Sequence, residues 1–283
     1  MTGVLTVAGY GLREALRRKV FAVVLLLTLG FLALYWIANR YTFDHLEGVI
    51  APQGLDARTF AGAFLLGLAM FATLFLGVVL AVFLTLGVVR GDAERGLLQP
   101  LVVRPIGRPT MLAARFLGAA AVCAPYTLGV YLGATAITGL TGGWWPGRVL
   151  VPGLELAAGV LLVAALSLLG SVFLSTIANG IAVFMLFGAG LVGGLLDTIA
   201  HALGSHGLLR AAKVVAWALP FEALYQDALH GITVGASGLT AFALRLGPFG
   251  GTEAGGATLP VWALAYFAVV AVAATASFAR RDL

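Results

Sequence analysis

Charged residues are scarce in this chain of 283 amino acids, at 10% of the total. A soluble domain carries about 25% charged residues, because its surface must meet water. Hydrophobic residues make up 61% of the sequence, and the mean hydropathy is +1.03. This composition excludes a soluble globular domain. It predicts an all-α integral membrane protein in which residues 1–283 form a single transmembrane domain.

Lysine and cysteine are rarer still, and their scarcity excludes two kinds of chemistry. A P-loop holds ATP phosphates with the pattern Gly-x-x-x-x-Gly-Lys-Ser/Thr. The two lysines, Lys19 and Lys213, each precede valine, so this chain cannot bind ATP in that way. The single cysteine, Cys123, excludes an intrachain disulfide.

Catalytic and metal-binding motifs are missing as well. Neither His-Glu-x-x-His nor Gly-x-Ser-x-Gly occurs, and we predict no catalytic residue in this chain. The histidines His201, His206 and His230, taken with Asp197 and Asp227, match no recognised metal-ligand spacing. We expect solvated loop histidines here, and we predict no metal site and no cofactor bound by this chain.

The net charge of +5 raises the question of a nucleic-acid partner. The arginines, however, stand beside long apolar runs, as they do where cytoplasmic loops and anionic headgroups meet a membrane. We therefore expect membrane lipid as a partner and no nucleic acid.

Long apolar runs are what the sequence has in abundance. About 20 apolar residues cross a bilayer as a helix, and six runs reach roughly that length. The predicted spans are 20–38, 60–89, 111–140, 150–174, 181–199 and 259–278. Residues 4–19 precede the first span with apolar residues at helical spacing and cations at their end, which predicts a helix lying along the headgroups. A signal peptide is the competing interpretation of the first run, but the run is longer than a signal h-region and no clean cleavage site follows it.

Six spans place both ends of the chain on one side of the membrane. That side then carries more Lys and Arg than the other, as the positive-inside rule requires. The predicted inner cations are Arg13, Arg17, Arg18, Lys19, Arg90, Arg95, Arg104, Arg108, Arg115, Arg280 and Arg281, and the outer ones are Arg40, Arg58, Arg148, Arg210, Lys213 and Arg245. We predict the cell (cytoplasmic) membrane, with both termini cytoplasmic.

The connection between spans five and six, residues 201–258, contains two apolar segments of helical spacing that Pro220 separates. In the second segment one face carries apolar residues from Phe221 to Leu229, while Glu222, Gln226 and His230 fall on another face. Neither segment is long enough to span. We predict a pair of short interfacial or re-entrant helices on the outer side.

Small residues form two further patterns inside the spans. Ser167, Ser171 and Ser175 recur every four residues on the fourth run, and Gly190 and Gly194 form a small-x-x-x-small pair on the fifth. Such residues let helices approach closely. Lining of a substrate path is the alternative that the sequence leaves open.

One polar stretch between the second and third runs stands apart, and we call residues 90–108 the docking stretch. Its acidic residues, Asp92 and Glu94, suit the first turn of a short helix, while Arg104 and Pro105 suit its end. The apolar side of this predicted coupling helix, residues 91–104, is formed by Leu97, Leu98, Leu101 and Val102. A short helix of this kind fits a groove on another protein. The simpler interpretation is a loop held by headgroup contacts.

The docking stretch also carries a family resemblance. The run Glu94-Arg95-Gly96-Leu97-Leu98, closed by Arg104-Pro105-Ile106-Gly107-Arg108, resembles the cytoplasmic coupling segment of ABC-2-type permeases. These are the exporter-type membrane subunits of ATP-binding-cassette transporters. Their usual form has a Glu-x-Gly-Thr-like start, paired leucines and a Pro-Val/Ile-Ser-Arg close. In this chain Leu97 replaces the hydroxyl residue, Gly107 replaces the serine, and Pro100 interrupts the helix.

The resemblance implies a permease subunit that forms the translocation path and couples to separate ATPase subunits, two per complex. It implies a second permease copy or a paralogue as partner, export as the direction, and ATP and magnesium bound on the ATPase. The residues that it assigns to ATPase docking are Asp92, Glu94, Arg95, Gly96, Leu97, Leu98, Leu101, Arg104 and Pro105. The substrate has no signature in the sequence.

An intramembrane enzyme acting on lipids is the alternative function. Such an enzyme needs clustered carboxylates or histidines near one membrane face. The sequence offers only unpatterned candidates in the outer connection: Asp197, His201, His206, Glu222, Asp227 and His230.

Overall fold

The computed structural model describes residues 19–46, 55–86, 108–245 and 255–280, and in these parts it contains helices and no strands. Six helices are long and apolar enough to cross a membrane. They are α2 (Lys19–Leu46), α3 (Ala57–Thr85), α6 (Arg108–Gly142), α7 (Leu150–Phe173), α8 (Thr176–Leu203) and α12 (Thr258–Ala279). The chain is thus an all-helical, multi-pass membrane protein, as its composition predicts.

Two predicted elements lie outside the described residues. These are the N-terminal helix 4–19, of which only Lys19 is described, as the first residue of α2, and the coupling helix 91–104.

The second span begins earlier and ends earlier than its apolar run. Asp56 caps α3, since its carboxylate accepts hydrogen bonds from the backbone amides of Arg58 and Thr59. The hydroxyl of Thr59 also donates to this carboxylate, and these bonds lower the pKa of Asp56. At the other end Leu86 takes an extended backbone (φ −64°, ψ 128°), so the helix stops at Thr85 and not at the predicted residue 89.

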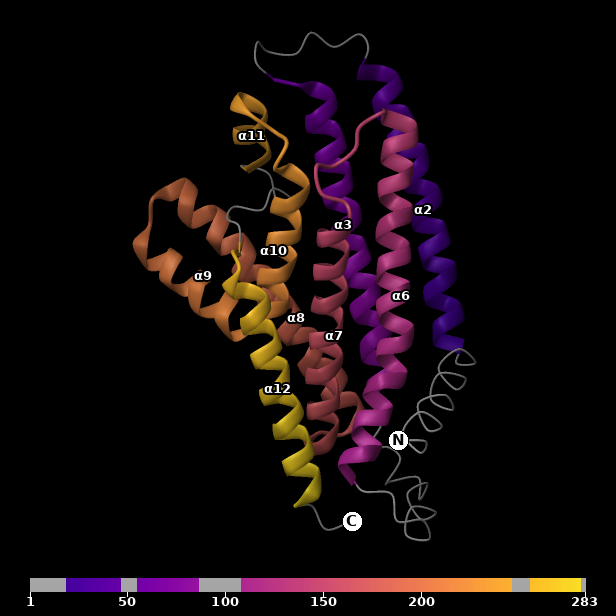
Figure 1. Cartoon of the computed structure of the whole chain (residues 1–283), viewed down its shortest axis with the longest axis vertical. Coiled ribbons are helices and arrows are strands. Elements are labelled where there is room, and N and C mark those ends of the chain that lie inside the picture. Colours follow the sequence, from indigo (N-terminus) through magenta and orange to yellow (C-terminus); the bar gives the residue numbers. More distant parts are fainter. Residues whose placement is uncertain (1–18, 47–54, 87–107, 246–254, 281–283) are drawn as a thin grey trace.

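The centre of the bundle is α7, which packs against α3, α6, α8, α10 and α12. In contrast, α2 lies on the outside against α3 and α6 (Figure 1). Only 17% of its most apolar segment is buried within the protein. Two hydrogen bonds tie α2 to α6. Thr28 pairs with Tyr126 across 2.5 Å, and Tyr35 pairs with Thr138 across 2.6 Å.

One end of the bundle gathers four chain segments. The end of α3, the start of α6, the turn between α7 and α8 and the end of α12 all lie at the lower end in Figure 1. The docking stretch therefore leaves and re-enters the described chain at the same end of the molecule.

Three short helices connect α8 to α12: α9 (His206–Ala218), α10 (Pro220–Thr233) and α11 (Gly238–Arg245). The first two occupy the two apolar segments that the sequence indicates, and α11 is an additional element. Gly204 ends α8 with a positive φ of 63°, which lets the chain reverse so that α9 packs back along α8. Pro220 then opens α10, where a missing amide hydrogen costs no helical bond.

Candidate functional site

The apolar face predicted for the α10 segment is buried in the bundle. Phe221, the first large side chain after the turn, is 1% exposed and stacks on Phe187 of α8, with ring centroids 5.7 Å apart. Its backbone carbonyl lies 3.4 Å from where a Cβ on Gly159 of α7 would be. Helix α10 therefore enters the bundle with its first turn.

Glu222 belongs to the second, polar face predicted for this segment, yet it is buried. Its side chain is 2% exposed, because α10 is covered on that side by α8 and α12. One carboxylate oxygen, Oε1, accepts a hydrogen bond of 2.8 Å from Gln226 Nε2. The other oxygen, Oε2, is buried without a hydrogen-bond partner among the described residues.

The predicted pair of small residues on α8 makes room for α10. A Cβ on Gly190 would lie 2.5 Å from Phe221 Cζ, and one on Gly194 would lie 2.1 Å from Glu222 Oε1. Gly190 is thus a helix-packing position. Gly194 serves packing and also lines a cavity.

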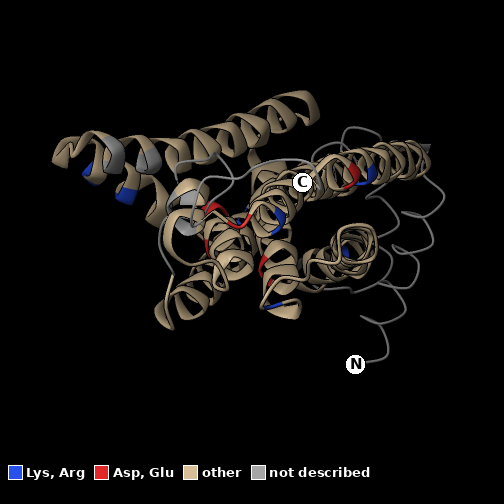
Figure 2. Ribbon diagram, turned by 90° about the horizontal axis from the view of Figure 1, so that it is seen from above, with Lys and Arg blue, Asp and Glu red and all other residues tan. Residues whose placement is uncertain are grey.

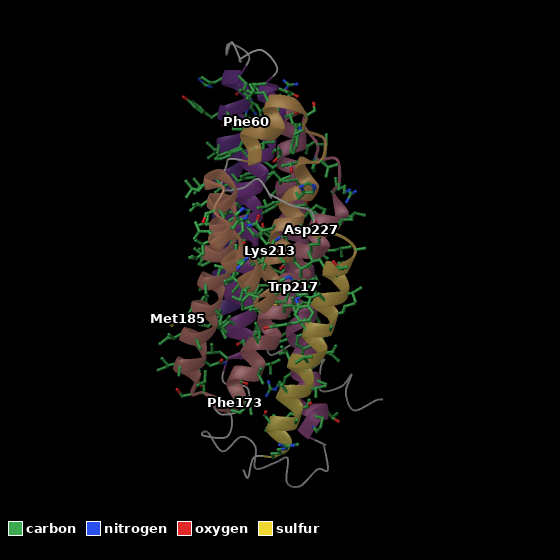
Figure 3. All side chains as sticks on the ribbon, turned by 90° about the vertical axis from the view of Figure 1, so that its left-hand side faces the viewer. Phe60, Phe173, Met185, Lys213, Trp217 and Asp227 are labelled. Carbon is green, nitrogen blue, oxygen red and sulfur yellow. The ribbon has the colours of Figure 1, made fainter. Side chains whose placement is uncertain are left out.

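That cavity, which we call the lateral cavity, lies between α8, α9, α10 and α12 and has a volume of about 330 Å³. Its polar and aromatic lining residues are Lys213, Trp217, Glu222, Gln226, Thr258 and Trp262. Trp262 Nε1 donates to the Trp217 carbonyl across 3.2 Å, and the two indole centroids are 5.1 Å apart. Figure 3 places Lys213 and Trp217 on one face, at mid-height of the molecule, beside α12.

The charges around the cavity are arranged from the edge of the bundle inward. In Figure 2, which looks along the bundle, blue basic positions lie at its far left edge and red acidic positions lie nearer the middle. Lys213 is exposed and Glu222 is buried, and both line the lateral cavity.

A second acidic position lies further along α10. Asp227 accepts a hydrogen bond of 2.9 Å from the Gly255 amide. Among the described residues, no three His, Cys, Asp or Glu side chains are grouped so as to hold a metal ion.

The predicted serine stripe is interrupted. Ser167 and Ser171 are buried in α7, but Leu174 takes an extended backbone and ends this helix, so Ser175 lies outside it. Ser175 is exposed and precedes the first residue of α8. The serine stripe therefore does not continue on one helix to Ser175, and the break lies next to residue 174, where the predicted fourth span ends.

Ser167 belongs to a hydrogen-bond network that the sequence does not reveal. Thr85, the last residue of α3, donates to Ser167 Oγ across 2.8 Å, and Asn179 of α8 donates to the Ser167 carbonyl across 2.9 Å. All three side chains are buried. Gly170 leaves the space for Asn179, since a Cβ there would lie 2.1 Å from Asn179 Oδ1. We call these residues the α3–α7–α8 link.

The residues predicted to dock an ATPase, from Asp92 to Pro105, all lie outside the described residues. Thr85 of the α3–α7–α8 link is the last residue of α3, the described helix that precedes them in the chain. No protein-family model matches this sequence, and no curated protein matches it.

Proposed function

We propose that the chain is the permease subunit of an ATP-binding-cassette exporter, forming the translocation path and driven by separate ATPase subunits. The observation that carries this proposal is the position of the docking stretch. It joins the end of α3 to the start of α6, two long helices that both pack on the central α7 (Figure 1).

Helix length supports a mechanical role for these two elements. At 1.5 Å per residue, the 29 residues of α3 and the 35 residues of α6 extend roughly 43 Å and 52 Å, whereas the hydrocarbon core is about 30 Å thick. Both helices are therefore longer than the membrane requires. A displacement of the docking stretch acts at their ends, outside the lipid.

The α3–α7–α8 link supplies a route for that displacement into the bundle. A hydrogen-bonded, buried contact at the end of α3 resists sliding of α3 past α7, so the three helix ends move together. The close approach of α7 to α8 at Gly170 restricts the link further. In this proposal, ATP-driven closure of two ATPase subunits moves the link and opens a path shared with a second permease copy or a paralogue.

The proposed orientation rests on charge over the whole sequence, in which the predicted inner set of Lys and Arg is larger than the outer set. The end of the bundle that receives the docking stretch bears Arg108, Arg115 and Arg280 of the inner set. By the positive-inside rule we infer that this end and both termini are cytoplasmic, in the cytoplasmic membrane of the cell.

The same orientation makes α9 and α10 a re-entrant hairpin from the outer side. Its turn, at Leu219 and Pro220, is buried, and the next residue, Phe221, packs beside Gly159 of α7 and Gly190 of α8, which lie within their spans and not at the ends. Non-helical backbone at such depth is stable where protein covers it. The hairpin closes the outer part of the bundle.

The proposal is tested by uncoupling. Glu94→Ala and Gly96→Leu are expected to abolish stimulation of the partner ATPase by the reconstituted permease, with normal permease abundance in the membrane. Glu47→Ala, in the connection on the opposite side, is the matched control and is expected to leave stimulation unchanged. Equal stimulation by all of these variants would contradict the proposal, and lipid turnover by the purified chain without nucleotide would favour a lipid-modifying enzyme instead.

A further inference from the structure

The lateral cavity contains a buried carboxylate with one oxygen to spare. Glu222 Oε1 is engaged by Gln226, whereas Oε2 has no partner among the described residues, although the side chain is 2% exposed. Burial raises the pKa of Glu222 to about 8, since a buried ionised group without a partner is costly. A ligand that donates hydrogen bonds and carries positive charge would therefore bind Oε2 and favour the ionised form. The glycine at position 194 keeps the cavity open beside this carboxylate, because any side chain there would strike Oε1.

The rim of the cavity has the opposite character. Lys213 is exposed on α9, and the first turn of α12 contributes Thr258 and Leu259 to the lining. The Leu259 amide donates to the Gly256 carbonyl and Pro260 has no amide hydrogen, so Lys213 is the group at this rim that favours an anion.

Two indoles form the wall between these charges. Trp217 is 59% exposed and Trp262 packs against it. Indole faces attract ammonium groups. The surface around the opening is apolar, with Val214 of α9 and Val261 and Leu264 of α12 exposed.

We propose that the lateral cavity binds a phosphoethanolamine group, with its primary ammonium on Glu222 and its phosphate on Lys213. A cavity of about 330 Å³ is far larger than a single ion requires and suits a small organic group. A primary ammonium donates three hydrogen bonds, whereas a quaternary choline donates none, so Glu222 selects the former. The inference is independent of ATPase docking, and its test uses no ATPase.

The test measures retained lipid on the full chain. The protein is purified in detergent, stripped of lipid, and titrated with phosphatidylethanolamine, phosphatidylcholine or phosphatidylglycerol, with bound lipid read by native mass spectrometry. We expect phosphatidylethanolamine to bind about tenfold more tightly than the other two, which is the size of one charge-assisted hydrogen bond. Glu222→Gln keeps the shape of the side chain and is expected to bring phosphatidylethanolamine down to the level of phosphatidylcholine. Lys213→Gln is expected to weaken all three lipids.

A control variant tests whether the lipid preference is specific to Glu222, and a competition experiment distinguishes a lipid headgroup from a free ligand. Asp44→Asn removes an exposed carboxylate of α2 that pairs with Arg40, and it is expected to leave the lipid preference unchanged. Soluble phosphoethanolamine is added as competitor. Competition at equal concentration identifies a free ligand, and absence of competition identifies the lipid headgroup, while both support the assigned chemistry. Equal binding of the three lipids by the wild-type chain, or an undiminished preference in Glu222→Gln, would overturn the proposal.

Discussion

At the scale of single residues, two glycines of α8 differ in their surroundings: one is packed against a buried ring, and the other has open space beside it. A methyl group on Gly190 would lie 2.5 Å from the buried ring of Phe221, whereas nothing lies within 4 Å of the corresponding position on Gly188. Both residues are glycines in the interior of α8, so their intrinsic helix propensities are the same.

We therefore predict opposite effects of alanine at these positions. Gly190→Ala is expected to destabilise the folded chain by about 1–3 kcal/mol, because a packed core resists added volume. Gly188→Ala is expected to be neutral or to stabilise it by up to about 1 kcal/mol, because alanine favours the helix. Thermal unfolding of the detergent-purified variants measures both, and equal shifts in the unfolding temperature would show that α10 does not pack at Gly190.

At the scale of elements, the α9–α10 hairpin makes the sharpest prediction. If the hairpin re-enters the membrane from outside, the start of α9 meets water and its end meets lipid. Gly207 and Ala218 are both exposed within the chain and lie near opposite ends of α9. Replacing Cys123 by alanine leaves no other thiol in the chain.

In that background we expect Gly207→Cys to react on intact cells with a membrane-impermeant maleimide. Ala218→Cys is expected to react at least about tenfold more slowly with this reagent, and to be labelled by a lipid-soluble maleimide. Comparable rates for both cysteines with the impermeant reagent would place the whole hairpin in water.

Some features of these elements can be predicted from the sequence alone, and others cannot. Apolar length predicts the six spans, and helical spacing predicts the buried face of α10, since both are properties of consecutive residues. The burial of Glu222 is not predictable in this way, because it depends on α8 and α12, which lie far away in the chain. The α3–α7–α8 link escapes prediction for the same reason: Thr85 and Ser167 are 82 positions apart. The end of α7 at Phe173, by contrast, lies one residue from the end predicted for the fourth span, because the polar residues that follow are consecutive in the sequence.

At the scale of the whole molecule, the bundle is asymmetric about its centre. α7 is surrounded by helices, whereas α2 is peripheral and packs on α3 and α6. The docking stretch connects to the surrounded part of the bundle. A force applied there reaches α7 through α3 and α6, and the peripheral α2 is not needed to transmit it.

The central claim is that the docking stretch binds an ATPase, and co-purification tests it most directly. The tagged chain is isolated from its native membranes with residues 91–104 either intact or replaced by a glycine-serine linker of equal length, and the same replacement of residues 47–54 serves as control. We predict that a Walker-motif ATPase accompanies the intact chain and the control in equal proportion to the permease, and that it is lost with residues 91–104. An ATPase retained at full proportion by the chain lacking residues 91–104 would contradict the account.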